Sequence, residues 1–145
     1  QQEAGDIINR YFRALPKVRD YIEKSYQDAR KRGYAVTDFG RIRPLDEVSV
    51  NPRDRGALKR IAVNTPIQGT AADIARMAMI KFYKHFEKRQ NVHLVLQIHD
   101  SLVCECAAEE KEAVVKDLTD IMESAATLSV PLKVEATWGH SLAEV

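Results

Sequence analysis

Two polar residues, His99 and Asp100, interrupt an apolar stretch in the C-terminal half of the chain, within the sequence LVLQIHDSLVCEC. The apolar runs on either side begin at Leu94 and at Leu102. A carboxylate in this place offers the kind of oxygen ligand that Mg²⁺ prefers. Aspartate is also common in turns for purely local hydrogen-bonding reasons, so a metal ligand and a turn residue are both open interpretations of Asp100 taken alone.

A second set of polar residues, Arg60, Asn64 and Gln68, recurs at every fourth position. This spacing places them on one face of a helix if the kink expected at Pro66 is mild. Arginine, asparagine and glutamine can hydrogen-bond base edges, whereas an exposed polar stripe is the alternative. Gly69 follows at once, although glycine costs about 1 kcal/mol in a helix relative to alanine. Either a close approach of the backbone to a strand or ligand, or simple kink geometry, explains it.

Composition sets the class of protein. The chain has 145 residues, of which 45% are hydrophobic and 30% charged, which indicates one globular domain rather than a disordered segment. No apolar run approaches the ~20 residues that span a bilayer, and no signal peptide opens the chain. Cys104 and Cys106 are too few for a disulfide framework and lack zinc-site spacing. We therefore expect reduced thiols in a cytoplasmic protein without a membrane partner.

Charge is distributed unevenly, although the formal net charge is only +1. Residues 1–60 carry 14 Lys/Arg against 9 Asp/Glu, and residues 61–145 carry 8 against 12. A basic half beside an acidic half suggests a polyanionic partner. Two solvated faces of different charge are the alternative.

Hydrophobic spacing and turn residues predict an α+β protein, in which helices lie on an antiparallel sheet. Predicted helices cover 3–13, Pro16 to Arg32 with Gly33 as its end, Ala57 to about Arg89 with a break or kink at Thr65-Pro66, and 107–128. Predicted strands lie within 33–45 around a turn at 38–40, within 92–106 as a hairpin with His99 and Asp100 at its tip, and at 130–138. Residues 46–56 are predicted to be a loop. The 92–106 turn lacks the Asn-Gly or Asp-Gly that usually closes a tight hairpin.

Several stretches, taken whole, resemble DNA polymerase I-type (family A) polymerases. RIAVNTPIQGTAADIARMAMI (60–80) is similar to the segment that leads into the palm of that family, and LQIHDSLVCE resembles motif C, the palm hairpin usually written His-Asp-Glu. Residues 10–45 resemble the later fingers helices and the small hairpin after them, and VPLKVEATWG resembles the closing palm strand. The resemblance covers essentially the whole chain in order.

The resemblance implies an anatomy and a set of roles. Residues 1–56 would be the later fingers helices and small hairpin, and residues 57–145 part of the palm: the kinked DNA-contacting helix, the metal-site hairpin, and the C-terminal helix and strand. Asp100 would bind the two catalytic Mg²⁺ ions, and His99 would lie near the primer terminus. Arg60, Asn64 and Gln68 would contact the minor groove and template-primer around the terminal base pair. Arg41 and Arg43 are candidate template contacts, with solvated surface arginines as the open alternative.

The chain departs from the family pattern in two ways. Ser101 stands where the family usually has glutamate, and serine supplies no charge to a metal. The motif A aspartate and the nucleotide-gripping fingers helix belong upstream of the region that matches Gln1. We therefore expect a C-terminal piece of a DNA-directed DNA polymerase that acts with primer-template DNA, deoxynucleoside triphosphates and the upstream remainder of its polypeptide. The 145 residues alone should be inactive.

Two other classes of protein stay open. A His-Asp doublet also marks metal phosphohydrolases of the HD type, but their doublets sit on helices with further ligands. His85, His93 and His140 show no such pattern. The second alternative is a non-catalytic nucleic-acid-binding module with a decayed metal site, of which Ser101 would be the symptom.

Overall fold

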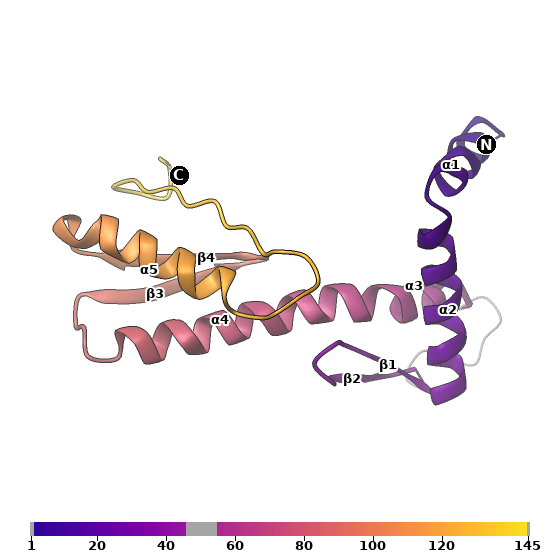
Figure 1. Ribbon diagram of the computed structural model, residues 1–145, viewed down its shortest axis with the longest axis horizontal. Helices are drawn as coiled ribbons and strands as arrows, with labels where there is room; N and C mark the ends of the chain where they lie inside the picture. The colour runs from indigo at the N-terminus through magenta and orange to yellow at the C-terminus, as the bar shows by residue number, and fades with distance from the viewer. Residues whose placement is uncertain (1, 46–54, 145) are drawn as a thin grey trace. The chain divides into compact units, whose positions relative to one another are not determined.

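The computed structural model describes residues 2–45 and 55–144 and divides into two compact units, Gln1–Thr70 and Ala71–Val145. We describe each unit by itself (Figure 1). Both combine helices with a two-stranded antiparallel hairpin, which confirms the α+β class. Across the described ranges, we find no helix that combines the length and apolar character needed to cross a membrane.

The first unit opens with two helices, α1 (Gln2–Ala14) and α2 (Pro16–Arg32). Pro16 occupies the first turn of α2, where its missing N–H costs nothing. At the other end Gly33 adopts φ 81° and donates its N–H to the Ala29 carbonyl at 2.8 Å, which caps the helix. Both predicted helices and the boundary between them are confirmed.

The first hairpin pairs β1 (Tyr34–Val36) with β2 (Ile42–Pro44), and Ala35 faces Arg43 in the register. Small side chains dominate the core beneath this hairpin, so the backbones approach closely. The buried members of this core are Ala29, Ala35, Leu45 and Ala62, with Tyr26, Leu58 and Ile61 packed against them.

A helical run follows, made of α3 (Arg55–Asn64), the π-helical turn η2 (Thr65–Gly69) and α4 (Thr70–Phe86). The sequence predicted a break or a kink at Thr65-Pro66. The run is not broken, because a π-turn accommodates Pro66, which lacks the N–H that an α-helical bond would need. α4 ends at Phe86, before the predicted Arg89. Most of the loop predicted at 46–56 lies outside the described residues, and its last two positions belong to α3.

The second unit is built around the hairpin of β3 (Val92–Ile98) and β4 (Ser101–Cys106), which lies alongside α4 and α5 (Lys111–Glu123) (Figure 1). The short helix η3 (Ala108–Glu110) leads into α5, so the predicted 107–128 helix is real but shorter. A cluster of large apolar side chains joins these elements: Phe82, Phe86, Val92, Val114 and Ile121.

The strand predicted at 130–138 is wrong, and so is the expectation of one sheet. The described strands form two separate pairs, β1–β2 and β3–β4, and residues 131–138 have no regular secondary structure. The alternation is still visible, since Leu132 and Val134 are half-buried while Lys133 is exposed. However, the Val134 N–H donates to the Glu123 carboxylate at 3.2 Å instead of joining a ladder. A strand needs a neighbouring strand, and alternation alone does not supply one.

Candidate nucleic-acid and metal site

His99 and Asp100 form the two-residue tip of the β3–β4 hairpin. Ile98 faces Ser101 in the register, so the tip residues are the only ones between the paired strands, as predicted. Both tip side chains are exposed. The other end of the hairpin is anchored in the core, because Val92 is buried and Leu94 packs against the same cluster. The apolar stem therefore holds a carboxylate and an imidazole out of the core.

The backbone at this tip is unusual. His99 has φ 55°, and no other non-glycine residue in the described ranges has a positive φ. Histidine tolerates this region better than most residues, but the conformation still costs energy relative to glycine. The Gln97 side-chain amide donates to the His99 carbonyl at 3.1 Å and so holds the peptide that joins His99 to Asp100. This role of Gln97 was not predicted from the sequence. The only indication of it there was the position of Gln97 two residues before His99.

Asp100 fits a divalent cation as one ligand of a shared site. Its carboxylate is a hard oxygen donor in an exposed position, and Mg²⁺ commonly takes only one or two protein carboxylates besides water and phosphate oxygens. Within residues 2–45 and 55–144, no three His, Cys, Asp or Glu side chains are grouped so as to hold a metal. Ser101, also exposed, contributes a neutral hydroxyl beside it.

The polar series on the helical run is exposed along its length. Arg60, Asn64 and Gln68 all face solvent, whereas Ala62 and Thr65 at the intervening positions are buried. Gln68 follows Pro66 within the π-turn η2, and the helical run continues through both residues. The three side chains are therefore accessible to a ligand.

The first hairpin contacts this helical run. Arg41 and Arg43 are exposed on it, and the Arg41 N–H donates to the Thr37 hydroxyl at 3.1 Å. The Asp38 N–H donates to the Thr70 hydroxyl at 3.0 Å. The first unit thus brings the candidate template contacts and the polar series onto linked elements. His99 and Asp100 belong to the second unit and are described separately.

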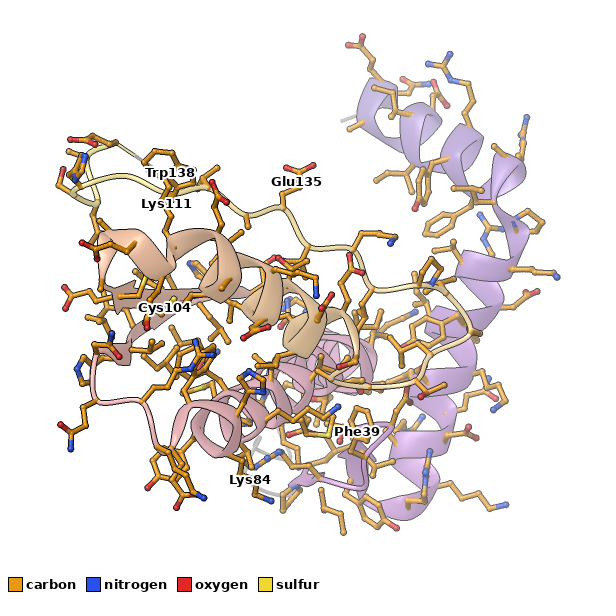
Figure 2. All side chains as sticks on the ribbon, turned by 60° about the vertical axis from the view of Figure 1, so that its left-hand side comes forward. Phe39, Lys84, Cys104, Lys111, Glu135 and Trp138 are labelled. Carbon is orange, nitrogen blue, oxygen red and sulfur yellow. The ribbon has the colours of Figure 1, made fainter. Side chains whose placement is uncertain are left out.

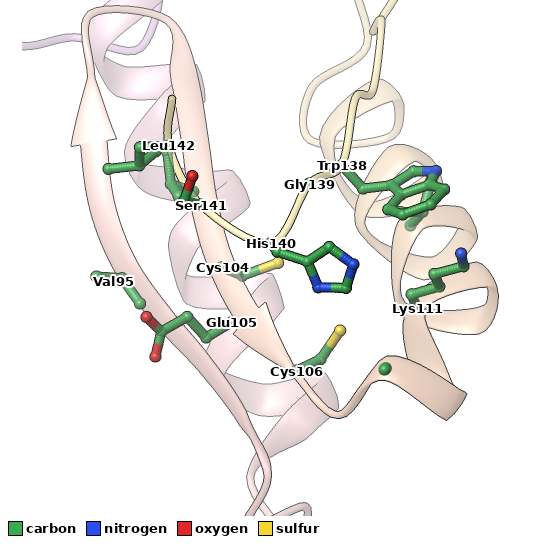
Figure 3. A pocket seen from close by; sticks show the side chains of 13 residues that line it. Val95, Cys104, Glu105, Cys106, Lys111, Trp138, Gly139, His140, Ser141 and Leu142 are labelled. Carbon is green, nitrogen blue, oxygen red and sulfur yellow. The ribbon is translucent and has the colours of Figure 1, made fainter. Parts of the chain in front are cut away.

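A cavity of about 570 Å³ in the second unit was not expected from the sequence. Cys104, Cys106 and His140 line it, together with Lys111 and Trp138 (Figure 3). The Lys111 ammonium lies 3.3 Å from the centre of the Trp138 ring, and the two side chains lie together in Figure 2. This cation–π contact attaches the C-terminal segment to α5.

The two cysteines of this cavity are free thiols, as predicted. Burial raises the pKa of Cys104, and the neighbouring Cys106 adds to the effect. Burial also raises the pKa of Cys106, with a smaller contribution from Glu110. The raised pKa values favour the thiol over the thiolate, which is the nucleophilic form of cysteine.

Comparison with known proteins gives a consistent result. The family model described as DNA polymerase family A matches residues 1–144. The chain is 42% identical over 140 residues to the thermostable DNA polymerase I of Thermus aquaticus, covering 96% of this chain and 17% of that protein. It is 42% identical over 143 residues to DNA polymerase I of Bacillus caldotenax, covering 97% of this chain and 16% of that protein.

A solved structure agrees with these relatives. It is the POL domain of Pol1 from M. smegmatis in complex with DNA primer-template and dNTP. The TM-score is 0.84 at 37% sequence identity, and the match covers 91% of this chain and 24% of that one. The chain thus spans about a sixth of the length of the curated relatives it matches, with 17% of the first. From this match over nearly all of its residues, the chain belongs to DNA polymerase family A.

Proposed function

We propose that this chain is the C-terminal part of a DNA-templated DNA polymerase that adds deoxynucleotides to a primer 3′ end. One observation carries the proposal: Asp100 is exposed at the tip of a hairpin whose stem is anchored in an apolar core. In a family A chain, this arrangement supports a reaction centre at the tip. The division into later fingers (1–56) and palm (57–145) is part of the proposal.

Asp100 would hold Mg²⁺, with two ions in the intact enzyme. Bound there, the ions would stabilise the attacking and leaving oxygens of phosphoryl transfer. Asp100 supplies a fixed negative charge, and the exposed His99 beside it would contact the primer terminus. Ser101 can orient water by hydrogen bonding but adds no charge, so further carboxylates must come from the upstream remainder of the polypeptide.

The exposed series Arg60, Asn64 and Gln68 would contact the minor groove of the terminal base pair. Minor-groove acceptors lie in nearly the same places for every correct pair, so such contacts test pair geometry without reading sequence. Arg41 and Arg43, exposed on the first hairpin, would contact template phosphates. Primer-template DNA and deoxynucleoside triphosphates are the proposed partners, and the cytoplasm is the proposed location.

The test is primer extension by the full-length protein with Asp100→Asn. Asparagine keeps the size and turn-forming ability of aspartate but removes the charge. We expect extension to fall by at least about a hundredfold, or ~2.7 kcal/mol of transition-state stabilisation. The matched control is Asp120→Asn, which removes a charge from an exposed aspartate on α5 that is 3.4 Å from Lys116. Equal extension by the two variants would make Asp100 a turn residue only.

The 145 residues alone should incorporate no nucleotide on a primed template with Mg²⁺. Asp100 by itself cannot hold the two ions that would position the attacking and leaving oxygens. Detectable extension by the purified fragment would overturn this part of the proposal.

Because Ser101 stands where the family usually has glutamate, a second function is a non-catalytic nucleic-acid-binding module with a decayed metal site. That function predicts a full-length protein that binds primer-template DNA tightly but extends no primer at any Mg²⁺ concentration. The two proposals therefore differ in the unmodified protein, before any substitution is made.

A further inference from the structure

The first hairpin meets the helical run at Gly69 and Thr70, directly after Gln68. We propose that Thr37, Asp38, Gly69 and Thr70, which we call the hairpin–helix brace, fix the π-turn and thereby the direction of the Gln68 side chain. These are positioning residues that act through Gln68. The proposal rests on the proposed role of Gln68 at the terminal base pair.

The brace requires glycine at position 69. A Cβ placed on Gly69 would lie 2.5 Å from the Thr37 Cγ2 atom, which is too close for two non-bonded carbon atoms. The hairpin therefore contacts the helical run at the residue that follows Gln68. Of the two explanations that the sequence left open for Gly69, close backbone approach is the one that this contact supports.

Thr37 cannot turn away from this contact at low cost. Its hydroxyl accepts the Arg41 N–H at 3.1 Å, and its own N–H donates to the Arg41 carbonyl at 3.0 Å. Only 4% of its surface is exposed. Rotation about χ1 would move the methyl group but would also remove the hydroxyl from Arg41, leaving a hydrogen bond unmade.

Thr70 makes the second contact of the brace. Its hydroxyl is buried and accepts the Asp38 N–H at 3.0 Å. Two consecutive hairpin residues therefore meet two consecutive helix residues, directly after Gln68. Neither Thr37 nor Thr70 carried any signal of this role in the sequence.

A π-turn is a rare interruption of an α-helix and is frequent at functional sites, so contacts that hold it in place bear on the side chains around it. A π-turn amounts to one residue inserted into a helix. If it moves or relaxes, neighbouring side chains turn by about 100°, the rotation per residue of an α-helix. Gln68 would then point in a different direction relative to Arg60 and Asn64.

The decisive variant is Gly69→Ala in the full-length protein, measured by single-turnover extension from matched and mismatched primer termini. We expect the matched rate to fall about tenfold or more, the range for losing one hydrogen-bonding contact, and the mismatched rate to fall much less. Gln68→Ala should show the same selective loss. Adding Gly69→Ala to Gln68→Ala should reduce the matched rate little further, because both act through one side chain.

Rescue separates positioning from general damage. Thr37→Ser removes the Cγ2 atom that an alanine at position 69 would meet but keeps the hydroxyl that Arg41 uses. The double variant Gly69→Ala/Thr37→Ser should therefore recover most of the matched rate. The matched control is Gly5→Ala, since Gly5 lies in α1 with nothing within 4 Å of the added Cβ. It should leave both rates unchanged.

A gentler pair of variants covers the case in which Gly69→Ala does not fold. Thr70→Val removes the acceptor of the Asp38 N–H, whereas Thr70→Ser keeps it. Only Thr70→Val should lower the matched rate selectively. The affinity for matched over mismatched primer-template, measured without nucleotide, should fall in parallel.

The outcomes distinguish the two proposals. Equal slowing on both primers by Gln68→Ala would overturn the proposed role of Gln68. A selective loss in Gln68→Ala, with an unchanged ratio in Gly69→Ala and Thr70→Val, would overturn the brace. The brace would also be overturned if Gly69→Ala folds but adding Thr37→Ser does not restore its matched rate.

Discussion

The two hairpins of this chain close their turns with different residues. In β1–β2 the turn contains Gly40 at φ 85°, and nothing lies within 4 Å of where its Cβ would be. In β3–β4 the positive φ falls on His99, and the next residue is Asp100. A glycine adopts the positive φ in the first turn, whereas in the second turn a histidine adopts it at a cost in backbone strain.

The two hairpins also differ in the side chains that support them. Small residues such as Ala35 and Ala62 pack beneath β1–β2, and hydrogen bonds from the brace hold its turn. Phe82, Phe86 and Val92 anchor β3–β4 through a core of large side chains. The anchored stem and the Gln97 side chain together hold the strained tip. The comparison indicates that the second hairpin is built to present its tip and the first to contact a helix.

The largest effect should come from the core beneath β3–β4. Phe86→Ala should destabilise this hairpin by about 3–5 kcal/mol, the usual cost of removing a buried phenylalanine. Hydrogen exchange of the β3 and β4 amides in the full-length protein measures it locally. The control is Tyr83→Ala on the same helix, because Tyr83 is 68% exposed. Equal protection of the hairpin in the two variants would contradict an anchored stem.

The next prediction compares the two turns directly. Gly40→Ala should destabilise β1–β2 by about 1–2 kcal/mol, because alanine must enter the left-handed region although no neighbour obstructs it. His99→Gly should not destabilise β3–β4, since relief of strain offsets the greater freedom of glycine in the unfolded chain. Amide exchange in each hairpin is the measurement. A large loss of protection in His99→Gly would mean that His99 is not strained.

The smallest effect should come from Gln97. Gln97→Ala removes an exposed hydrogen bond to the His99 carbonyl, worth about 0.5–1 kcal/mol, so amides at the tip should exchange roughly two- to fivefold faster. Gln27→Ala is the control, because Gln27 also makes an exposed side-chain bond, to Glu23 on α2. Unchanged exchange at the tip would show that the stem alone fixes the turn.

Local chemistry let the sequence predict much of this protein. Pro16 and Gly33 set the ends of α2, because one lacks an N–H and the other tolerates positive φ. The polar doublet in an apolar run predicted the tip of β3–β4. The exposure of Arg60, Asn64 and Gln68 agrees with their polar side chains at helical spacing. Each of these features depends on residues a few positions apart, whose preferences act before the chain folds.

Tertiary structure decided the rest. Pro66 disfavours a regular α-helix without determining what replaces it, and in the folded chain a π-turn forms there and meets a hairpin at Gly69. Alternation at 130–138 favours a strand, but a strand forms only where another backbone offers its hydrogen bonds, and here the Glu123 carboxylate takes the Val134 N–H. These outcomes depend on partners distant in sequence, so spacing and residue type could not predict them.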